Sequence, residues 1–271
     1  MAIINIPDAP AIGLPENTKS SGKRVDFKPD DFALAIETKG YLLLWERAIE
    51  CPCTPVTTQT EQPDPNCELC KGIGVIYFGA SDAQILSEYT LNDLQQHLVD
   101  TTGGMVIRGL INTVTSKQNP YDVIGKWVEG SANLTVRHEN RVGYYDKITS
   151  LDSRIVFKEV IVADGTNTLP TRYPVIGVNY MRTVDTEYTS GAEFYIENGV
   201  ITWHPGNVPD ENTRFAVHYL CHPTWLIIEH PHAVRVTSNL FKTKTPTTPT
   251  GEPRQLPIQA AMRYDFMPSP E

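Results

Sequence analysis

The stretch Phe194–Trp203, FYIENGVITW, decides the fold class of this chain. Two short runs rich in aromatic and β-branched residues flank the pair Asn198-Gly199. An Asn-Gly pair adopts the positive φ angles of a tight hairpin turn at low cost, and that turn matches the twist of two antiparallel strands. The stretch therefore predicts a β-hairpin, and it is the strongest short hairpin signal in the sequence.

The same β texture extends outward from the hairpin over residues 103–241. Short runs of Val, Ile, Tyr and Phe are bounded by Gly, Pro, Asn and Asp, the pattern of antiparallel strands in sandwiches or small barrels. The predicted strands are Met105–Thr115, Leu134–Arg137, Ile155–Val162, Val175–Thr183, Phe194–Ile196, Val200–Trp203, Phe215–Tyr219 and Trp225–Val236. We expect a mainly β protein with a small barrel-like module at residues 103–170 and a sandwich-like module at residues 171–241.

Residues 30–102 are expected to form a helical and cysteine-bearing segment. Asp30 or Asp31 is placed to cap a short helix that begins at Phe32. The run Tyr41–Glu50, YLLLWERAIE, is predicted to be a second helical piece, because its large apolar residues recur at helical spacing. A strand followed by a short helix, or one irregular helix, is expected between Ala83 and Asp100.

The two ends of the chain have linker-like composition. Residues 1–29 are polar and proline-rich, and they predict an extended arm that is ordered only against a neighbour. Residues 242–271 are predicted to be a Thr/Pro linker, Lys242–Arg254, followed by a C-terminal docking tail that regains apolar residues. That tail either docks on a neighbouring subunit or packs on its own domain, and the sequence leaves both open.

Overall composition limits the function classes. The net charge is −9 and the sequence contains no basic run, which disfavours sequence-independent binding to nucleic acid. The longest apolar runs, such as Tyr41–Trp45, are far shorter than the roughly 20 residues that span a bilayer. The start of the chain lacks the features of a signal peptide. We expect a soluble protein made in a cytoplasm, with no membrane partner.

The cysteine spacing is the main chemical signal. Cys51-Pro52-Cys53 is followed after a turn-rich loop by Cys67-Glu68-Leu69-Cys70. Two close pairs across a loop present four thiolates to one tetrahedral ion, and zinc is the ion most often held in this way. Glycines just after the second pair suit a turn whose amides point toward the sulfurs. Cys51, Cys53, Cys67 and Cys70 are therefore predicted to be ligands of a structural zinc ion, and four free thiols are the alternative.

No other residues form a comparable chemical pattern. A second metal site would have to combine His218, Cys221 and His222, but neighbouring positions on a strand point to opposite faces. The sequence contains no nucleophile elbow, P-loop, HExxH motif or dinucleotide fingerprint. A spatial cluster of Asp146, Asp152 and Asp185 could not be judged from sequence. We predict no catalytic residues, no organic cofactor and no enzymatic activity.

Two stretches resemble structural proteins of tailed bacteriophages. Gly40–Ala48, GYLLLWERA, running into Cys51-Pro52-Cys53, with Pro63–Gly74, PDPNCELCKGIG, is similar to the N-terminal zinc-ribbon-like segment of proteins encoded among phage head and neck genes. The run Glu187–Trp203 has the texture of phage neck and baseplate proteins, and the segment Leu256–Arg263 resembles chain ends in that group.

The resemblance implies a head-to-tail connector, which is a non-enzymatic ring subunit in the neck of a virion assembled in the bacterial host cytoplasm. Its implied partners are further copies of itself, twelvefold or sixfold, together with adjoining portal, adaptor, collar or tail proteins. Packaged DNA would pass it without specific binding. Competing interpretations are a tail-tip or baseplate protein, a zinc-dependent hydrolase or nuclease, and a host zinc-ribbon protein that binds nucleic acid.

Overall fold

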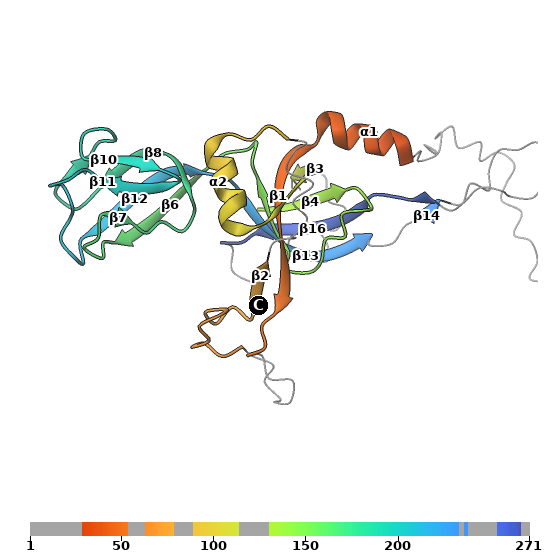
Figure 1. Ribbon diagram of the computed structural model, residues 1–271, viewed down its shortest axis with the longest axis horizontal. Coiled ribbons are helices and arrows are strands. Elements are labelled where there is room, and N and C mark those ends of the chain that lie inside the picture. Colours follow the sequence, from red (N-terminus) through yellow and green to blue (C-terminus); the bar gives the residue numbers. More distant parts are fainter. Residues whose placement is uncertain are drawn as a thin grey trace, which may run out of the picture.

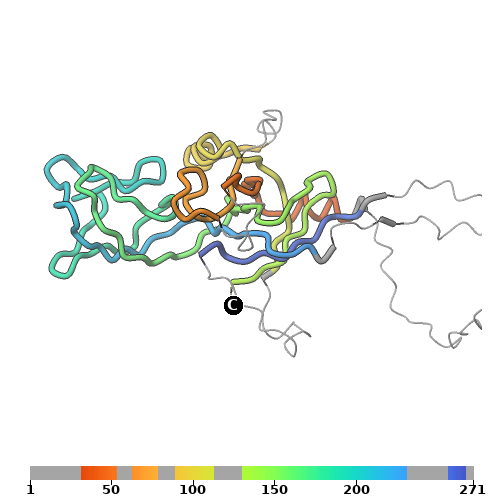
Figure 2. The backbone as a smooth tube through the Cα atoms, turned by 90° about the horizontal axis from the view of Figure 1, so that it is seen from below, coloured from red at the N-terminus to blue at the C-terminus, as the bar shows by residue number. Residues whose placement is uncertain are grey.

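The structure is a computed structural model that describes residues 29–53, 63–78, 89–113, 130–232, 236–237 and 254–266. The predicted arm up to residue 28 and the predicted linker up to residue 253 lie outside these ranges. Within them, no helix is both long enough and apolar enough to cross a membrane. The molecule is elongated, with a β-barrel in the middle and a β-sandwich at one end (Figure 1; Figure 2).

Six antiparallel strands form the barrel. Their order is β1-β3-β4-β16-β13-β5, and the circle closes because β5 also pairs with β1. Closure gives each of these six strands a neighbour on both sides. The strands are β1 (Tyr41–Glu50), β3 (Met105–Thr113), β4 (Ser131–Val136), β5 (Lys147–Ser150), β13 (Thr224–His232) and β16 (Ile258–Tyr264).

The barrel interior is filled by alternate side chains of its strands. Leu43 and Trp45 of β1 lie opposite Ile107 and Met105 of β3, and all four contribute to one apolar core. Gly109 of β3 faces the same core, where an added Cβ would lie 2.7 Å from a Leu43 methyl carbon. The interior is therefore a packed core that leaves no room for a larger side chain at Gly109.

The sandwich is inserted between β5 and β13. One sheet has the order β6-β12-β8-β9 and the other β10-β11-β7, and large aromatic residues such as Trp203 and Phe215 fill the space between them. The strands are β6 (Ile155–Val162), β7 (Thr168–Leu169), β8 (Val175–Arg182), β9 (Glu187–Tyr188), β10 (Phe194–Glu197), β11 (Val200–Trp203) and β12 (Arg214–Cys221).

The hairpin predicted at Asn198-Gly199 is confirmed. Strands β10 and β11 pair with Glu197 opposite Val200, and the two turn residues have φ angles of 51° and 80°. Both angles are positive, as a type I′ turn requires. The mainly β, antiparallel fold class with barrel and sandwich modules is likewise what the structure has.

The remaining elements lie outside the two modules. They are α1 (Pro29–Lys39), β2 (Val75–Phe78), α2 (Asp93–Thr102), β14 (Val236–Thr237) and β15 (Arg254–Gln255). The predicted first helix exists but begins at Pro29, a residue suited to the first turn of a helix. The Gly40 amide donates to the Ile36 carbonyl oxygen at 2.8 Å where the helix ends.

The helix predicted at Tyr41–Glu50 is wrong, because this segment is the barrel strand β1. Leu43 and Trp45 face the barrel interior, while Leu42 and Leu44 face outward into a second core beneath α2. A strand buried on both faces has a continuous apolar run, and such a run also satisfies the spacing of a helix. Tertiary burial on two sides therefore explains the failed prediction.

The sheets group the chain differently from the predicted module boundaries. The barrel takes strands from both ends of the described chain, including β1 and β16, and the sandwich occupies residues 155–221 between them. The expected C-terminal tail supplies β16, which pairs with β4 on one side and β13 on the other. Of the two alternatives for this segment, packing on its own domain is the one observed.

Helix α2 and the end of β16 join the barrel to the sandwich. Leu98 and Val99 of α2 pack on the outer face of the barrel. Leu94 of the same helix lies against the sandwich, where a Cβ added at Gly199 would be 3.1 Å from a Leu94 methyl carbon. Beyond β16, the Tyr173 hydroxyl of the sandwich donates a hydrogen bond to the Asp265 carboxylate. Phe266 stacks on Tyr264 at a centroid distance of 4.9 Å and also meets aromatic rings of the sandwich. This junction fixes the sandwich against one end of the barrel.

The buried carboxyl group at this junction predicts a pH dependence of stability. Burial raises the pKa of Asp265, although Tyr173, Arg172 and Lys147 act in the opposite direction. A group with a raised folded-state pKa holds its proton more tightly in the folded chain than in the unfolded chain. Its contribution to the free energy of unfolding therefore falls as the pH rises from 3.8, the ordinary pKa, through the folded-state pKa. The variant Asp265→Asn cannot ionise at this position, so it should not lose stability in this way as the pH rises.

Urea unfolding of the wild-type chain and the Asp265→Asn variant over the acidic range would measure the effect. The free energy of unfolding of the variant relative to the wild type should increase with pH and then become constant. Asp185→Asn, at an exposed turn position of the sandwich, serves as the matched control. A difference between Asp265→Asn and the wild type that does not change with pH would contradict the prediction.

Candidate metal centre

The candidate metal centre lies at the end of a two-stranded ribbon that projects from the barrel (Figure 1). The first half of β1 belongs to the barrel, whereas Arg47–Glu50 pair with β2. Cys51 directly follows β1, and its amide donates to the Gly74 carbonyl oxygen at 2.8 Å, which extends the ribbon by one residue pair. The barrel thereby positions the first cysteine through a continuous strand.

The second cysteine pair is held by a compact turn before β2. The Cys67 amide donates to the Asp64 carbonyl oxygen at 3.1 Å, and the Lys71 amide donates to the Cys67 carbonyl oxygen at 2.8 Å. Lys71, Gly72 and Gly74 have positive φ angles of 52°, 83° and 82°. The expected role of the glycines is confirmed, because the turn after Cys70 passes through the left-handed region that glycine tolerates best.

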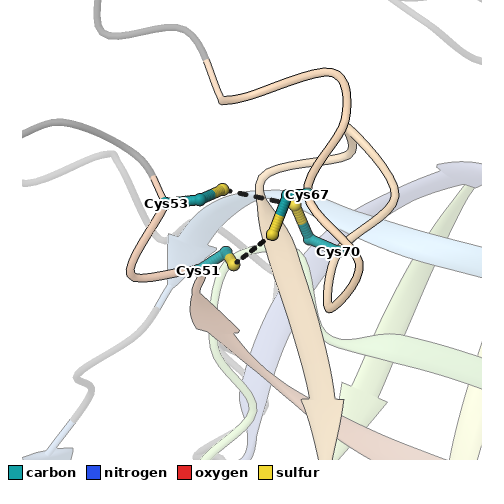
Figure 3. Close-up of side chains that lie close together, drawn as sticks. All are labelled: Cys51, Cys53, Cys67 and Cys70. Carbon is teal, nitrogen blue, oxygen red and sulfur yellow. Dashed lines mark hydrogen bonds between the residues drawn. The ribbon is translucent and has the colours of Figure 1, made fainter.

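The four predicted cysteines converge on one point (Figure 3). Their Sγ atoms all lie within 4.8 Å of one another. The Sγ atoms of Cys51 and Cys67 are 3.7 Å apart, and those of Cys53 and Cys70 are 3.5 Å apart. A tetrahedral ion with metal–sulfur bonds of about 2.3 Å places its sulfur ligands about 3.8 Å apart. The four thiols therefore lie close enough to bind a metal ion.

The protonation preferences of the thiols also fit a cation site. Burial would raise the pKa of Cys70, but backbone amides of Gly74 and Gly72 and the thiol of Cys53 lower it to about 7. Burial and contacts with the other thiols raise the pKa of Cys53 to about 12. Four negative sulfurs this close repel one another, so a cation is needed for all four to ionise together.

The geometry describes a closed site. Cys51 and Cys70 are buried, while Cys53 and Cys67 are half-buried. Four thiolates complete a tetrahedral shell and leave no position for water or substrate. The arrangement can stabilise the turn and the end of the ribbon, which have no apolar core of their own, and it does not present an open metal to a reactant.

The other histidines and cysteines named from the sequence do not form a second site. His218 lies on the outer face of the sandwich sheet, whereas Cys221 is fully buried in the sandwich core and burial raises its pKa to about 12. The His222 Nδ1 atom lies 2.9 Å from the Ser153 carbonyl oxygen. Among the residues that the structure describes, the four clustered cysteines are the only such group with metal-binding spacing.

The three aspartates considered from the sequence serve separate structural roles. The Asp146 carboxylate accepts hydrogen bonds from the Trp45 indole at 2.7 Å and from the Ala48 amide at 2.9 Å. Asp152 accepts from the Leu42 amide at 2.6 Å, and Asp185 is an exposed turn residue. Asp146 thus ties the barrel half of β1 to its ribbon half. Sequence reasoning missed this role, because a buried acid in a polar loop has no distinguishing local pattern.

Comparison of this sequence with models of protein families and with curated proteins finds no match in either.

Replacing one ligand tests the metal centre. Cys70→Ser should reduce the metal content from about one ion per chain to nearly none, because an alcohol is a poor ligand beside three thiolates. Elemental analysis of the purified chain measures the content, and hydrogen exchange of residues 63–78 measures the loosening of the turn. Cys221→Ala removes a thiol from the sandwich core and should keep the ion. Equal metal content in the two variants would contradict the assignment.

Proposed function

We propose that this chain is a structural protein of a tailed-bacteriophage virion, a ring-forming component of the neck that connects the head to the tail. The observation that supports this most strongly is where the phage-like stretches lie in the fold. Residues 40–48 and 63–74 build the barrel strand β1 and the cysteine turn at the end of its ribbon. The run Glu187–Trp203 lies within the sandwich, and Leu256–Arg263 contributes β16.

The architecture suits a ring subunit that must keep a fixed shape. A closed barrel and an inserted sandwich are rigid bodies that hold their shape without a ligand. The junction through Tyr173, Asp265 and Phe266 limits rotation between the two. A ring subunit needs this fixed geometry, because small angular errors in each copy accumulate around a closed ring.

We propose zinc as the ion held by Cys51, Cys53, Cys67 and Cys70, in a structural role. Zinc prefers four thiolates in tetrahedral geometry, and a small turn without a core gains its stability from such an ion. The thiol spacing supports this identity. The ion would keep the end of the ribbon in one shape and would supply no chemistry to a substrate.

The acidic composition supports a role beside DNA without binding it. A net charge of −9 repels phosphates, so DNA could move past such a surface without sticking. Neighbours of the ring would be other copies of this chain, in twelvefold or sixfold symmetry, and the adjoining portal, adaptor, collar or tail proteins. Assembly would take place in the bacterial host cytoplasm.

A zinc-dependent hydrolase or nuclease is the candidate of a different class. It requires an open metal position and ligands such as His or carboxylate. The four thiols form a closed set, which favours the structural proposal. A tail-tip or baseplate protein would use the same fold and the same metal centre, and only its position in the particle would differ.

Genetic complementation tests the proposal. In a phage that lacks this gene, the wild-type chain should restore infectious particles, whereas Cys67→Ser should leave filled heads and free tails that do not join. The reason is that loss of the ion loosens the ribbon and thereby the subunit contacts. Cys221→Ala should restore particles to wild-type yield. Normal particle yield without the gene, or a requirement for the gene in an enzymatic step before assembly, would contradict a neck function.

A further inference from the structure

The sandwich carries an unusual apolar surface on the outside of its four-stranded sheet. Along the edge strand β6, the outward residues Val156, Val160 and Val162 are 47, 70 and 46% exposed. Outward positions on a solvated sheet are normally polar. The neighbouring strands continue this surface with Arg214, Ala216 and His218 of β12 and Tyr180 and Arg182 of β8, and together with the three valines and Lys158 we call it the valine face.

The valine face is hollowed at its centre. Register places His218 directly opposite Lys158 of β6 on one side and Tyr180 of β8 on the other, and Ala216 lies opposite Val160. The small alanine leaves a groove of about 400 Å³. The groove is lined by Lys158, Glu159, Val160, Tyr180, Ala216, Val217 and His218. Its size and its apolar walls suit one or two aliphatic side chains of a partner.

The turn that bears the second cysteine pair exposes two such side chains. Leu69 and Ile73 are 69 and 66% exposed, although a turn of this kind is normally polar. They lie at the end of the projecting ribbon, within residues 63–74, which we call the cysteine tip. Hydrogen bonds within the turn hold the tip in a defined shape, so it can enter a groove without first becoming ordered.

The charges around the two surfaces are complementary. The cysteine tip exposes the acids Asp64 and Glu68 and one base, Lys71. The valine face presents the bases Lys158, Arg214 and Arg182. Two acids lie in this part of the sheet. Glu187 is opposite Arg182, and Glu159 lines the groove, where its carboxylate accepts hydrogen bonds from the Tyr219 hydroxyl and the Arg172 amide. Neither Glu68 nor Lys158 forms an ion pair within the part of the chain that the structure describes. Among the described residues, Glu68 and Lys158 are therefore available to pair with each other across a contact between two copies.

The two surfaces lie at different places on one chain. The ribbon projects from the barrel, and the sandwich extends from its side (Figure 1). Because two different patches are involved, pairing them between copies gives a head-to-tail contact, and such contacts close into a ring when the rotation per copy divides a full turn.

We propose that the cysteine tip of one copy docks into the valine face of the next copy, with Leu69 in the groove and Glu68 beside Lys158. The occupant of the groove is a second copy of this chain within a ring, and in this respect the inference rests on the proposed function. It gives the metal centre a further role, since the ion would hold the tip that forms the subunit contact.

A charge exchange between the two surfaces tests this contact. Glu68→Lys places a lysine against Lys158 of the next copy, and Lys158→Glu places an acid against Glu68, so each variant alone should weaken self-association roughly tenfold or more. An equimolar mixture should recover it, because every contact in an alternating assembly again joins an acid to a base. Sedimentation velocity of the purified full-length chains over a range of concentrations measures each case.

Matched controls separate this effect from misfolding. Leu69→Ser and Val160→Ser, both at exposed positions, should weaken association, whereas Val184→Ser, 85% exposed and outside the valine face, should not. A wild-type chain that stays monomeric, single charge variants that assemble normally, or a mixture that fails to recover would overturn the inference. Recovery of self-association in the equimolar mixture, combined with purified virions that lack the protein, would support the contact between copies and contradict only the neck function.

Discussion

The pairing of β1 with three partners is the constraint on which the rest of the structure depends. The first half of this strand pairs with β3 and β5 and closes the barrel, and its second half pairs with β2 and forms the ribbon. The buried Asp146 carboxylate bonds to both halves, through the Trp45 indole and the Ala48 amide. A change in the register of β1 would therefore shift the barrel core and the first cysteine pair together, since a slip of one residue exchanges the two faces of a strand.

The insertion of the sandwich follows from barrel closure. Strands β5 and β13 are neighbours in the barrel, so the two connections to the sandwich leave and return side by side. Two adjacent connections alone would act as a hinge. Helix α2 and the C-terminal residues Asp265 and Phe266 add contacts on further sides, and they convert two modules into one elongated body (Figure 2). The proposed ring contact uses both of its projecting features, the ribbon and the sandwich.

The sequence was informative wherever local chemistry determines structure. Three features depend on residues that are close in the chain. They are the Asn198-Gly199 turn, most of the strands between Met105 and His232, and the clustering of the four cysteines at the candidate metal centre. The error at Tyr41–Glu50 arose because burial on both faces removes the alternation that marks a strand. The closure of the barrel by β1, β5 and β16 could not be predicted, because it joins segments more than one hundred residues apart through backbone pairing. The valines of β6 have the spacing of an ordinary strand in the sequence. Only the register with β12 shows that Val156, Val160 and Val162 share one exposed face.

The neck assignment can be tested most directly by imaging the head-to-tail junction of intact particles by cryo-electron microscopy. The map should contain a ring whose repeating unit fits the closed barrel, the inserted sandwich and the projecting ribbon, with density for an ion among Cys51, Cys53, Cys67 and Cys70. A junction map at side-chain resolution in which no density fits this chain would contradict the neck assignment, whether the chain is then found at the tail tip or outside the particle.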